Sequence, residues 1–499
     1  MMSTAKPLSV AVRLATTAEW ERDCVDALRA TGDIEICRLE EVGSLQGLDL
    51  ILDLTSRPAS PGQILGPRYG YWTFLYGEKP ERIAPGLLEI VAGRRAAFVR
   101  LARLLPGGRA VILREGSVKA VTHSWSRTRR RLLEVASRWP VETLRALARC
   151  EAAPAGTEVE LPARSRASRI GLRARLPAAL VRNLGRRIRL ELTREHWRIG
   201  VIEQPIGRLV AAFDPAEIRW LDAPFDGFLA DPFGLAGSDG SVTILAEALE
   251  RGEQRGRIAA IERGRDGRLA VSPTSLSFDS HLSYPQLIRH DGEIYCIPES
   301  AAQRRVQLFR AVEFPGRWVR DCVLLEGFAG ADSTVIRHQE RWWMFTCNHA
   351  DQDEAKLFIF HSSRLHGPWQ PHASNPVKCD LRSSRPAGTP FIGEDGALYR
   401  PAQDCSRVYG GALVINRVTR LTAGEFQEEV AAHLRPDRSG PCPDGLHTLS
   451  AVGDLTLVDG KRHELVPWAV AAALSRLNGG HRRRIILAHG QDRLRQPAS

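Results

Sequence analysis

Lysine is scarce in this chain: six of the 69 basic residues are Lys, and all the others are Arg. Against 58 acidic side chains, these cations leave a formal net charge of +11. An Arg excess of this kind is as typical of GC-rich coding as of selection for a polyanionic partner, so the charge is weak support for nucleic-acid binding. No nucleic-acid recognition module is visible, and we expect no nucleic-acid partner.

Cysteine is also sparse and shows no pattern. The nine Cys are scattered between Cys24 and Cys442 without a CxxC pair, which argues against a zinc ribbon and against a disulfide framework. Long apolar runs are lacking: no stretch approaches the ~20 apolar residues of a membrane span, and the N-terminus has no signal-peptide core. These absences predict a cytoplasmic protein and argue against a secreted polysaccharide-degrading enzyme.

A chain of 499 residues predicts two or three domains. Residues 1–155 alternate between apolar strand-like segments, at 8–12 and 48–54, and segments with helical spacing, at 19–30 and 87–105. This alternation predicts a Rossmann-like α/β domain with a parallel sheet. No GxGxxG follows the first strand, so no dinucleotide site is predicted.

Residues 156–195 form an Arg-rich segment in which Arg alternates with Leu and Ala from Arg164 to Arg189. We interpret it as a linker helix. A basic amphipathic helix can lie on an anionic membrane surface, which would place the protein peripherally at the inner membrane face. The alternative is a solvated helix between two domains, the commoner meaning of a charged run.

Residues 196–465 contain an internal repeat. In three segments a Glu or Gln follows the Gly of an Asp-Gly turn by seven residues; these are Glu247, Glu299 and Gln403. An Asp-Gly pair between apolar runs predicts a β-hairpin. Two further segments match this pattern more loosely. The first residues of the five repeat segments, called blade starts below, are Asp231, Tyr284, Asp332, Arg385 and His447.

The spacing of these starts is typical of four-stranded propeller blades, so we predict an all-β five-bladed propeller over 196–465 and a C-terminal extension over 466–499. A hairpin brings its first and last residues to the same end. Asp231 should therefore lie near Glu247, Tyr284 near Glu299, and Arg385 near Gln403.

The first strand of each blade lines the propeller axis. The polar residues at the blade starts should therefore surround one opening of the central channel. This ring comprises Asp231, His281, Tyr284, Glu299, Asp332, Arg385, Gln403 and His447, with Glu247 beside Asp231. Carboxylates and amides bind hydroxyl groups and aromatic rings stack on C–H faces, so the ring predicts a sugar site. Taken singly, each residue has a structural alternative, such as an Asp that caps a turn. Three tryptophans, Trp318, Trp342 and Trp343, are expected in the blade cores.

Several motifs in this region resemble one known family. They are His196-Trp197-Arg198-Ile199-Gly200, Ala230-Asp231-Pro232-Phe233, His281-Leu282-Ser283-Tyr284-Pro285, Pro298-Glu299-Ser300, Phe314-Pro315-Gly316-Arg317-Trp318, Gly367-Pro368-Trp369, Arg385-Pro386-Ala387-Gly388 and Arg400-Pro401-Ala402-Gln403-Asp404. Over about 190–465 they resemble the N-terminal propeller domain of glucosamine inositolphosphorylceramide transferases and their bacterial relatives. This fold is similar to that of glycoside hydrolase family 43. Some bacterial members carry a formyltransferase-like domain before the propeller, and residues 1–155 look like a diverged version.

The resemblance implies roles for several residues. Asp231 and Asp332 fall at the positions of the base and the pKa-tuning Asp of family 43, while Arg385 stands where those hydrolases have their acid. Glu299 or Glu247 would then supply the proton, and Arg385 would hold an anionic group such as phosphate.

Two functions remain open. The first is an enzyme of glycoconjugate or polysaccharide biosynthesis, with Asp231, Asp332 and Glu299 as catalytic residues acting on a sugar that is phosphorylated or lipid-linked. The second is a glycan-binding scaffold without catalysis. No metal or other cofactor is predicted from spacing; analogy with family 43 leaves open a central cation near His447.

Overall fold

The computed structural model describes residues 7–14, 19–55, 59–150, 156–162, 166–238, 240–263, 268–274, 276, 278–352 and 354–465. Arg164, Asp239 of the first predicted turn, and the extension 466–499 lie outside them. The chain forms two compact units, Met1–Arg186 with Ala329–Arg435, and Arg187–Phe328 with Pro436–Ser499. Among the described residues, no helix has both the length and the apolar character needed to cross a bilayer.

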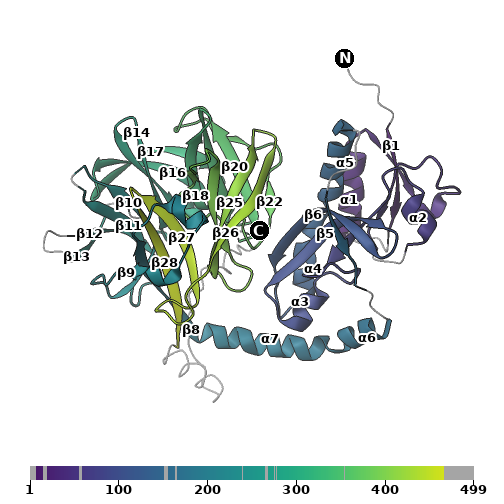
Figure 1. Ribbon diagram of the computed structural model, residues 1–499, viewed down its shortest axis with the longest axis horizontal. Helices are drawn as coiled ribbons and strands as arrows, with labels where there is room; N and C mark the ends of the chain where they lie inside the picture. Colours follow the sequence, from purple (N-terminus) through teal and green to yellow (C-terminus); the bar gives the residue numbers. More distant parts are fainter. Residues whose placement is uncertain are drawn as a thin grey trace, which may run out of the picture. The chain divides into compact units, whose positions relative to one another are not determined.

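The N-terminal domain is built on a seven-stranded sheet with the order β2-β1-β3-β4-β5-β6-β7 (Figure 1). Its strands are β1 (Leu8–Arg13), β2 (Ile34–Arg38), β3 (Leu50–Asp53), β4 (Tyr71–Tyr76), β5 (Ala96–Leu105), β6 (Arg109–Lys119) and β7 (Thr157–Glu160). Its helices are α1 (Glu19–Arg29), η1 (Leu39–Glu41), α2 (Pro61–Leu65), α3 (Leu87–Ala92), α4 (Trp125–Ala136) and α5 (Trp139–Cys150). Apolar clusters cover both faces of the sheet.

The predicted all-parallel, Rossmann-like sheet is not what this domain contains. Strands β1 to β4 pair in parallel, but β4 to β7 pair antiparallel, so the sheet is mixed. The chain passes from β5 to β6 through a tight turn in which Gly107 and Gly108 both have a φ of +76°. Such a turn can only join antiparallel neighbours, since a parallel pair needs a long crossover.

Two further boundaries differ from the sequence predictions. The helix expected over 87–105 ends at Ala92, where Gly93 adopts the left-handed conformation of a helix C-cap. The remainder forms β5, because its apolar residues are buried within the sheet between β4 and β6. In addition, residues 157–160 of the predicted linker form β7 at the edge of this sheet.

Two helices follow, α6 (Arg166–Ala174) and α7 (Leu176–Glu191), so most of the Arg-rich segment is helical as predicted. The chain then enters five antiparallel sheets, which confirm the five-bladed propeller.

The first four blades run in chain order. They are β10 (Gly227–Ala236), β11 (Val242–Glu250), β12 (Arg257–Arg263) and β13 (Leu269–Pro273); β14 (Ser283–His290), β15 (Glu293–Glu299), β16 (Arg305–Glu313) and β17 (Arg317–Glu326); β18 (Gly330–His338), β19 (Arg341–Asn348), β20 (Lys356–Ser362), β21 (Gln370–Pro371) and β22 (Lys378–Cys379); β23 (Phe391–Ile392), β24 (Leu398–Asp404), β25 (Ala412–Leu421) and β26 (Phe426–Leu434). Short 3₁₀ turns lie at η2 (Ile206–Val210), η3 (Pro215–Glu217) and η4 (Ala301–Gln303).

The fifth blade combines both ends of the propeller sequence. Its strands β27 (Gly445–Val452) and β28 (Leu455–Leu465) pair with β8 (Thr193–Ile202), which pairs with β9 (Arg219–Trp220). Ten residue pairs join β28 to β8, so the segment after the linker helix is held by the last strands of the chain.

Candidate functional site

The inner strands of the propeller are irregular at the residues that the sequence repeat marks as blade starts. Strands β10, β14 and β18 each contain one register shift, and the residues inside the shifts are Asp231, Tyr284 and Asp332. All three have left-handed backbone, with φ of 51°, 47° and 49°. This conformation costs a non-glycine residue about 1–3 kcal/mol and is concentrated at functional sites. Its recurrence at three equivalent positions points to a conserved role of the bulge within the repeat.

The structure confirms the hairpin pairings predicted from the repeat. Ala230, next to Asp231, pairs with Glu247, and Ser283, next to Tyr284, pairs with Glu299. In the fourth blade the backbone N–H of Gln403 donates to the carbonyl of Arg385 over 2.9 Å.

Asp231 lies in a buried polar cluster with His447 and Thr448 of β27. The Thr448 hydroxyl donates to Asp231 Oδ1 over 2.8 Å, and His447 Nε2 is 3.5 Å from the same oxygen. Asp231 and His447 are both about 5 % exposed. Two residues 216 positions apart along the chain thus present a carboxylate and an imidazole to one another, as expected if blades one and five meet.

Asp459 of β28 anchors this cluster. Its carboxylate accepts backbone N–H groups from Asp231, His447 and Thr448, over 2.8, 3.2 and 2.8 Å. The same carboxylate is 2.6 Å from His447 Nδ1. A proton on Nδ1 is therefore donated to Asp459, and Nε2 faces Asp231. Asp459 fixes both the bulge of β10 and the orientation of the imidazole.

A second layer supports the His447 ring. The indole of Trp197 stacks on it with centroids 3.8 Å apart, and Lys461 Nζ lies 4.9 Å from the indole centroid. Lys461 is fully buried and is paired over 2.6 Å with Glu195. Burial of Glu195 would raise its pKa, but hydrogen bonds from His463 and Lys461 lower the pKa to about 2. Glu195 therefore neutralises the Lys461 ammonium throughout the physiological pH range.

Glu247 and His281 form a second contact in the same unit. His281 Nδ1 accepts the backbone N–H of Gly256 over 2.8 Å, so Nε2 carries the proton and lies 3.4 Å from Glu247 Oε1. The His281 side chain is 46 % exposed, whereas that of Glu247 is 10 % exposed. This pair presents a solvent-facing imidazole supported by a carboxylate.

Asp332 lies in the other unit, where Arg385 and Gln403 hold it. Arg385 donates through Nε and a terminal nitrogen to the two carboxylate oxygens, over 2.5 and 3.2 Å, and Gln403 Nε2 donates over 2.9 Å. All three side chains are buried. The charge of Arg385, expected to hold an anion, is therefore directed at Asp332, and the geometry favours a role in orienting that carboxylate.

Arg400 fixes the chain that leads to Arg385. It donates to the carbonyl oxygens of Ser383 and Ser384, over 2.6 and 3.3 Å, and pairs with Glu428 over 2.6 Å. Burial would raise the pKa of Glu428, but Arg400 and Lys378 lower it. The Arg-Pro-Ala motif at Arg400 is thus structural.

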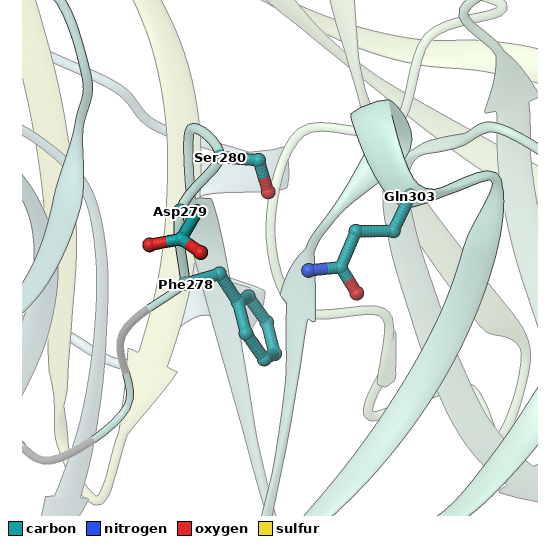
Figure 2. Close-up of a pocket in the computed structure, with 4 residues that line it drawn as sticks. All are labelled: Phe278, Asp279, Ser280 and Gln303. Carbon is teal, nitrogen blue, oxygen red and sulfur yellow. The ribbon is translucent and has the colours of Figure 1, made fainter.

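A pocket lies in the connections around the second blade (Figure 2). Its volume is about 550 Å³, and Phe278, Asp279, Ser280 and Gln303 line it. The Gln303 amide nitrogen points across the pocket toward the side where Ser280 and Phe278 lie, with the Phe278 ring below the Ser280 hydroxyl in this view (Figure 2). Ser280 directly precedes His281, so the pocket adjoins the Glu247–His281 pair along the chain.

The remaining predicted residues have distinct environments. Tyr284 is fully buried, and its ring packs edge-on against Phe233 with centroids 4.9 Å apart, which is a core position. Glu299 is half-buried at the end of β15. The tryptophans Trp318, Trp342 and Trp343 are buried, as expected of blade-core residues. The catalytic and binding roles assigned to the ring residues stay predictions.

The main omission of the sequence reasoning is Asp459. In the repeat the acid or amide follows the turn Gly by seven residues, whereas Asp459 follows Gly453 by six. A repeat pattern that accepts a spacing of six or seven residues after the turn Gly would have included Asp459. Trp197 belongs to the His196-Trp197-Arg198-Ile199-Gly200 motif. Its contact with His447 was not predicted, because that contact depends on the pairing of β8 with β28.

Asp231, His447 and Asp459 also bring three donor atoms within 4.8 Å of one another. Carboxylates and an imidazole suit a divalent cation. The Nδ1 atom of His447 is engaged by Asp459, so a cation would be held by Nε2 and the Asp231 carboxylate, with Asp459 as the orienting partner. The central cation near His447 stays a prediction.

Comparison with known proteins tests the family resemblance that the sequence motifs indicate. Residues 220–441 match the family model described as glucosamine inositolphosphorylceramide transferase 1, N-terminal. The resemblance predicted from the motifs is confirmed. The Arabidopsis thaliana glucosamine inositolphosphorylceramide transferase 1 is 33 % identical over 221 residues, which are 43 % of this chain and 28 % of that protein. Its counterpart from Oryza sativa subsp. japonica is 32 % identical over 208 residues, 40 % of this chain and 27 % of that protein. The chain thus spans little more than a quarter of these curated transferases.

Several solved structures match this chain at low sequence identity and low TM-score. Zg3597, a family 117 glycoside hydrolase from Zobellia galactanivorans, is 11 % identical with a TM-score of 0.36, covering 56 % of this chain and 92 % of that one. The exo-β-1,3-galactanase 1,3Gal43A from Clostridium thermocellum is 12 % identical with a TM-score of 0.33, covering 45 % and 57 %. Similarity at this level carries no information about activity.

Proposed function

We propose that this chain is a carbohydrate-active protein of glycoconjugate biosynthesis, which binds a sugar at the propeller and uses Asp231 as a general base. The observation that carries the proposal is the Asp231–His447–Asp459 cluster, in which a carboxylate on strained backbone is oriented by a hydroxyl and an imidazole. Buried, convergent polar groups on left-handed backbone are costly without a use.

The proposed chemistry assigns one task to each group. Asp231 accepts the proton of an attacking hydroxyl, which must come within hydrogen-bond reach of its carboxylate. Asp459 orients His447, and the Thr448 hydroxyl, which donates to Oδ1, stabilises the Asp231 carboxylate. Asp332, oriented by Arg385 and Gln403, is the second carboxylate, and Glu299 is the proposed acid.

The substrate class follows from the relatives' name, which joins glucosamine to a phosphoryl-linked ceramide. We propose a sugar that is phosphorylated or lipid-linked. The pocket of Phe278, Ser280 and Gln303 supports sugar binding, because a ring face, a hydroxyl and an amide are the groups that recognise a pyranose. The formyltransferase-like character of the N-terminal domain and a cytoplasmic location at the inner membrane surface remain predictions.

The test is Asp231→Asn, with Asp291→Asn as its matched control. Asp291 has the same left-handed backbone, with φ of 49°, but lies in an exposed hairpin turn. The purified chain is incubated with a panel of sugar nucleotides and phosphate-linked lipid acceptors, and new glycans are detected by mass spectrometry. We expect turnover to fall by roughly 10²–10⁴-fold in Asp231→Asn, the range of a lost general base, and to be unchanged in Asp291→Asn. Full activity of Asp231→Asn would refute the role of base.

One observation favours a second candidate, a glycan-binding protein without catalysis. The charge of Asp332 is balanced by Arg385 in the protein interior, and both side chains are at most 6 % exposed. A site built for binding alone predicts saturable sugar binding in calorimetry and no product from any donor in the panel.

A further inference from the structure

The helical segment α6–α7 is unusual in charge. Between Pro162 and Leu190 the sequence contains nine Arg and neither Asp nor Glu. The first acidic residue after Pro162 is Glu191, the last residue of α7. Arginines therefore far outnumber acids in the segment, unlike a solvated linker helix, whose charges usually alternate in sign.

One face of α7 is packed against the N-terminal domain. Asn183 is 1 % exposed and donates to the carbonyl oxygens of Ile90 and Thr122, over 2.8 and 2.9 Å. Ala179, one turn earlier, is 2 % exposed, and Arg182 donates to the carbonyl of Val91. These contacts fix the rotation of the helix about its axis.

The opposite face of α7 is apolar and open. Val181, Leu184 and Ile188 are 73 %, 48 % and 50 % exposed. Their spacing of three and four residues places them in one stripe, and at 100° per residue Asn183 lies on the far side from Val181. Ile170 of α6 is 61 % exposed. Among the described residues, half of the ten most exposed large apolar side chains lie between Ile170 and Leu190.

Arginines flank this stripe. Arg182 and Arg187 are exposed and, by helical geometry, lie on either side of Val181. Long Arg side chains can extend from the edge of an apolar stripe and present guanidinium groups to phosphates, which they bind in a bidentate manner.

We infer that this face of α6–α7 docks on an anionic lipid bilayer, with the Val181–Leu184–Ile188 stripe in the headgroup–acyl boundary and the arginines on lipid phosphates. Charge complementarity selects this occupant, because a segment with nine Arg and a single Glu matches an anionic surface. The apolar stripe distinguishes it from a nucleic-acid site, because a polyanion in water would leave these side chains uncovered. The inference goes beyond the sugar site and does not depend on it.

The experiment is flotation of the full chain with vesicles of phosphatidylcholine alone or with 30 % phosphatidylglycerol. The variants are Val181→Ser/Leu184→Ser/Ile188→Ser and Arg173→Gln/Arg187→Gln; Arg173 is exposed on α6, and Arg182 is kept because it holds the Val91 carbonyl. Val312→Ser/Val319→Ser serves as the control, since these apolar residues are exposed to 44 % and 42 % on the second blade. Circular dichroism verifies that each variant is folded, as expected for exposed positions.

We expect binding to the anionic vesicles only, a fall in binding as salt rises, and at least a tenfold loss in both helix variants, with the control unchanged. Equal binding to neutral vesicles, or unchanged binding of the stripe variant, would overturn the inference. Retention of a DNA duplex that depends on Arg173 and Arg187, without vesicle binding, would overturn it in favour of a polyanion site.

Discussion

At the scale of single residues, Glu89 in the N-terminal domain is a buried carboxyl group that is only partly hydrogen-bonded. Glu89 of α3 is 2 % exposed; one of its oxygens accepts the backbone N–H of Phe98, and the other has no hydrogen-bond partner. Burial raises the pKa of Glu89 to about 7. The carboxyl group is thus held in its neutral form below neutrality.

Glu89→Gln should stabilise the protein at pH 8 and not at pH 4. Because the folded-state pKa lies above the unfolded value of 4.5, stability is lost as pH rises from about 4.5 to 7. The amide keeps the acceptor for Phe98 and removes this penalty, on the order of 3 kcal/mol at pH 8. Urea unfolding at the two pH values measures it. The exposed Glu134→Gln on α4 is the control, and an equal gain at both pH values would contradict the argument.

Residue-scale prediction from sequence succeeded where a local repeat sets the geometry. The pairing of Asp231 with Glu247 follows from counting along one hairpin. The left-handed bulge at Asp231 and its anchoring by Asp459 could not be predicted in this way, because they depend on the register between β10, β27 and β28.

At the scale of elements, apolar periodicity identified α1 but misassigned 96–105. That segment has apolar residues on both sides, as a strand buried on two faces requires, and such runs do not distinguish a helix from a buried strand. Only its pairing with β4 and β6 decides the outcome. The propeller was more predictable, because each blade repeats the same hairpin signals.

The fourth blade depends on the buried Arg400–Glu428 pair. Their side chains are 1 % and 3 % exposed, and Lys378 adds a second cation. Glu428→Gln would leave buried positive charge uncompensated, so we expect a loss of about 3–5 kcal/mol of unfolding free energy. Arg417→Gln removes a pair with Asp395 that is exposed to about 40 %, so it should leave the unfolding free energy close to that of the wild type. Chemical denaturation compares the two, and similar losses would refute the assignment.

At the scale of the whole molecule, the N-terminal domain and the third and fourth blades share one compact unit. Ala96 and Phe98 of β5 pack with Ala355, Leu381 and Cys405. Through Cys405 this cluster reaches the site, because the thiol is 3.7 Å from the Gln403 amide oxygen. Neither contact was predictable from sequence, since no local pattern reports which loops meet a distant sheet.

Glu354 is the central polar residue of the contact between the N-terminal domain and the third and fourth blades. Its loss should uncouple the domain from these blades. It is 2 % exposed and pairs with Arg95 and with Lys119, over 2.6 Å to the latter. Glu354→Ala leaves both cations without their carboxylate, so we expect a loss of about 3–5 kcal/mol and two calorimetric transitions in place of one. Asp351→Ala, which removes a pair exposed to 45 % at its acid, is the control and should leave the melting profile unchanged. A single transition at the wild-type temperature in Glu354→Ala would show that this contact does not couple the domain to the blades.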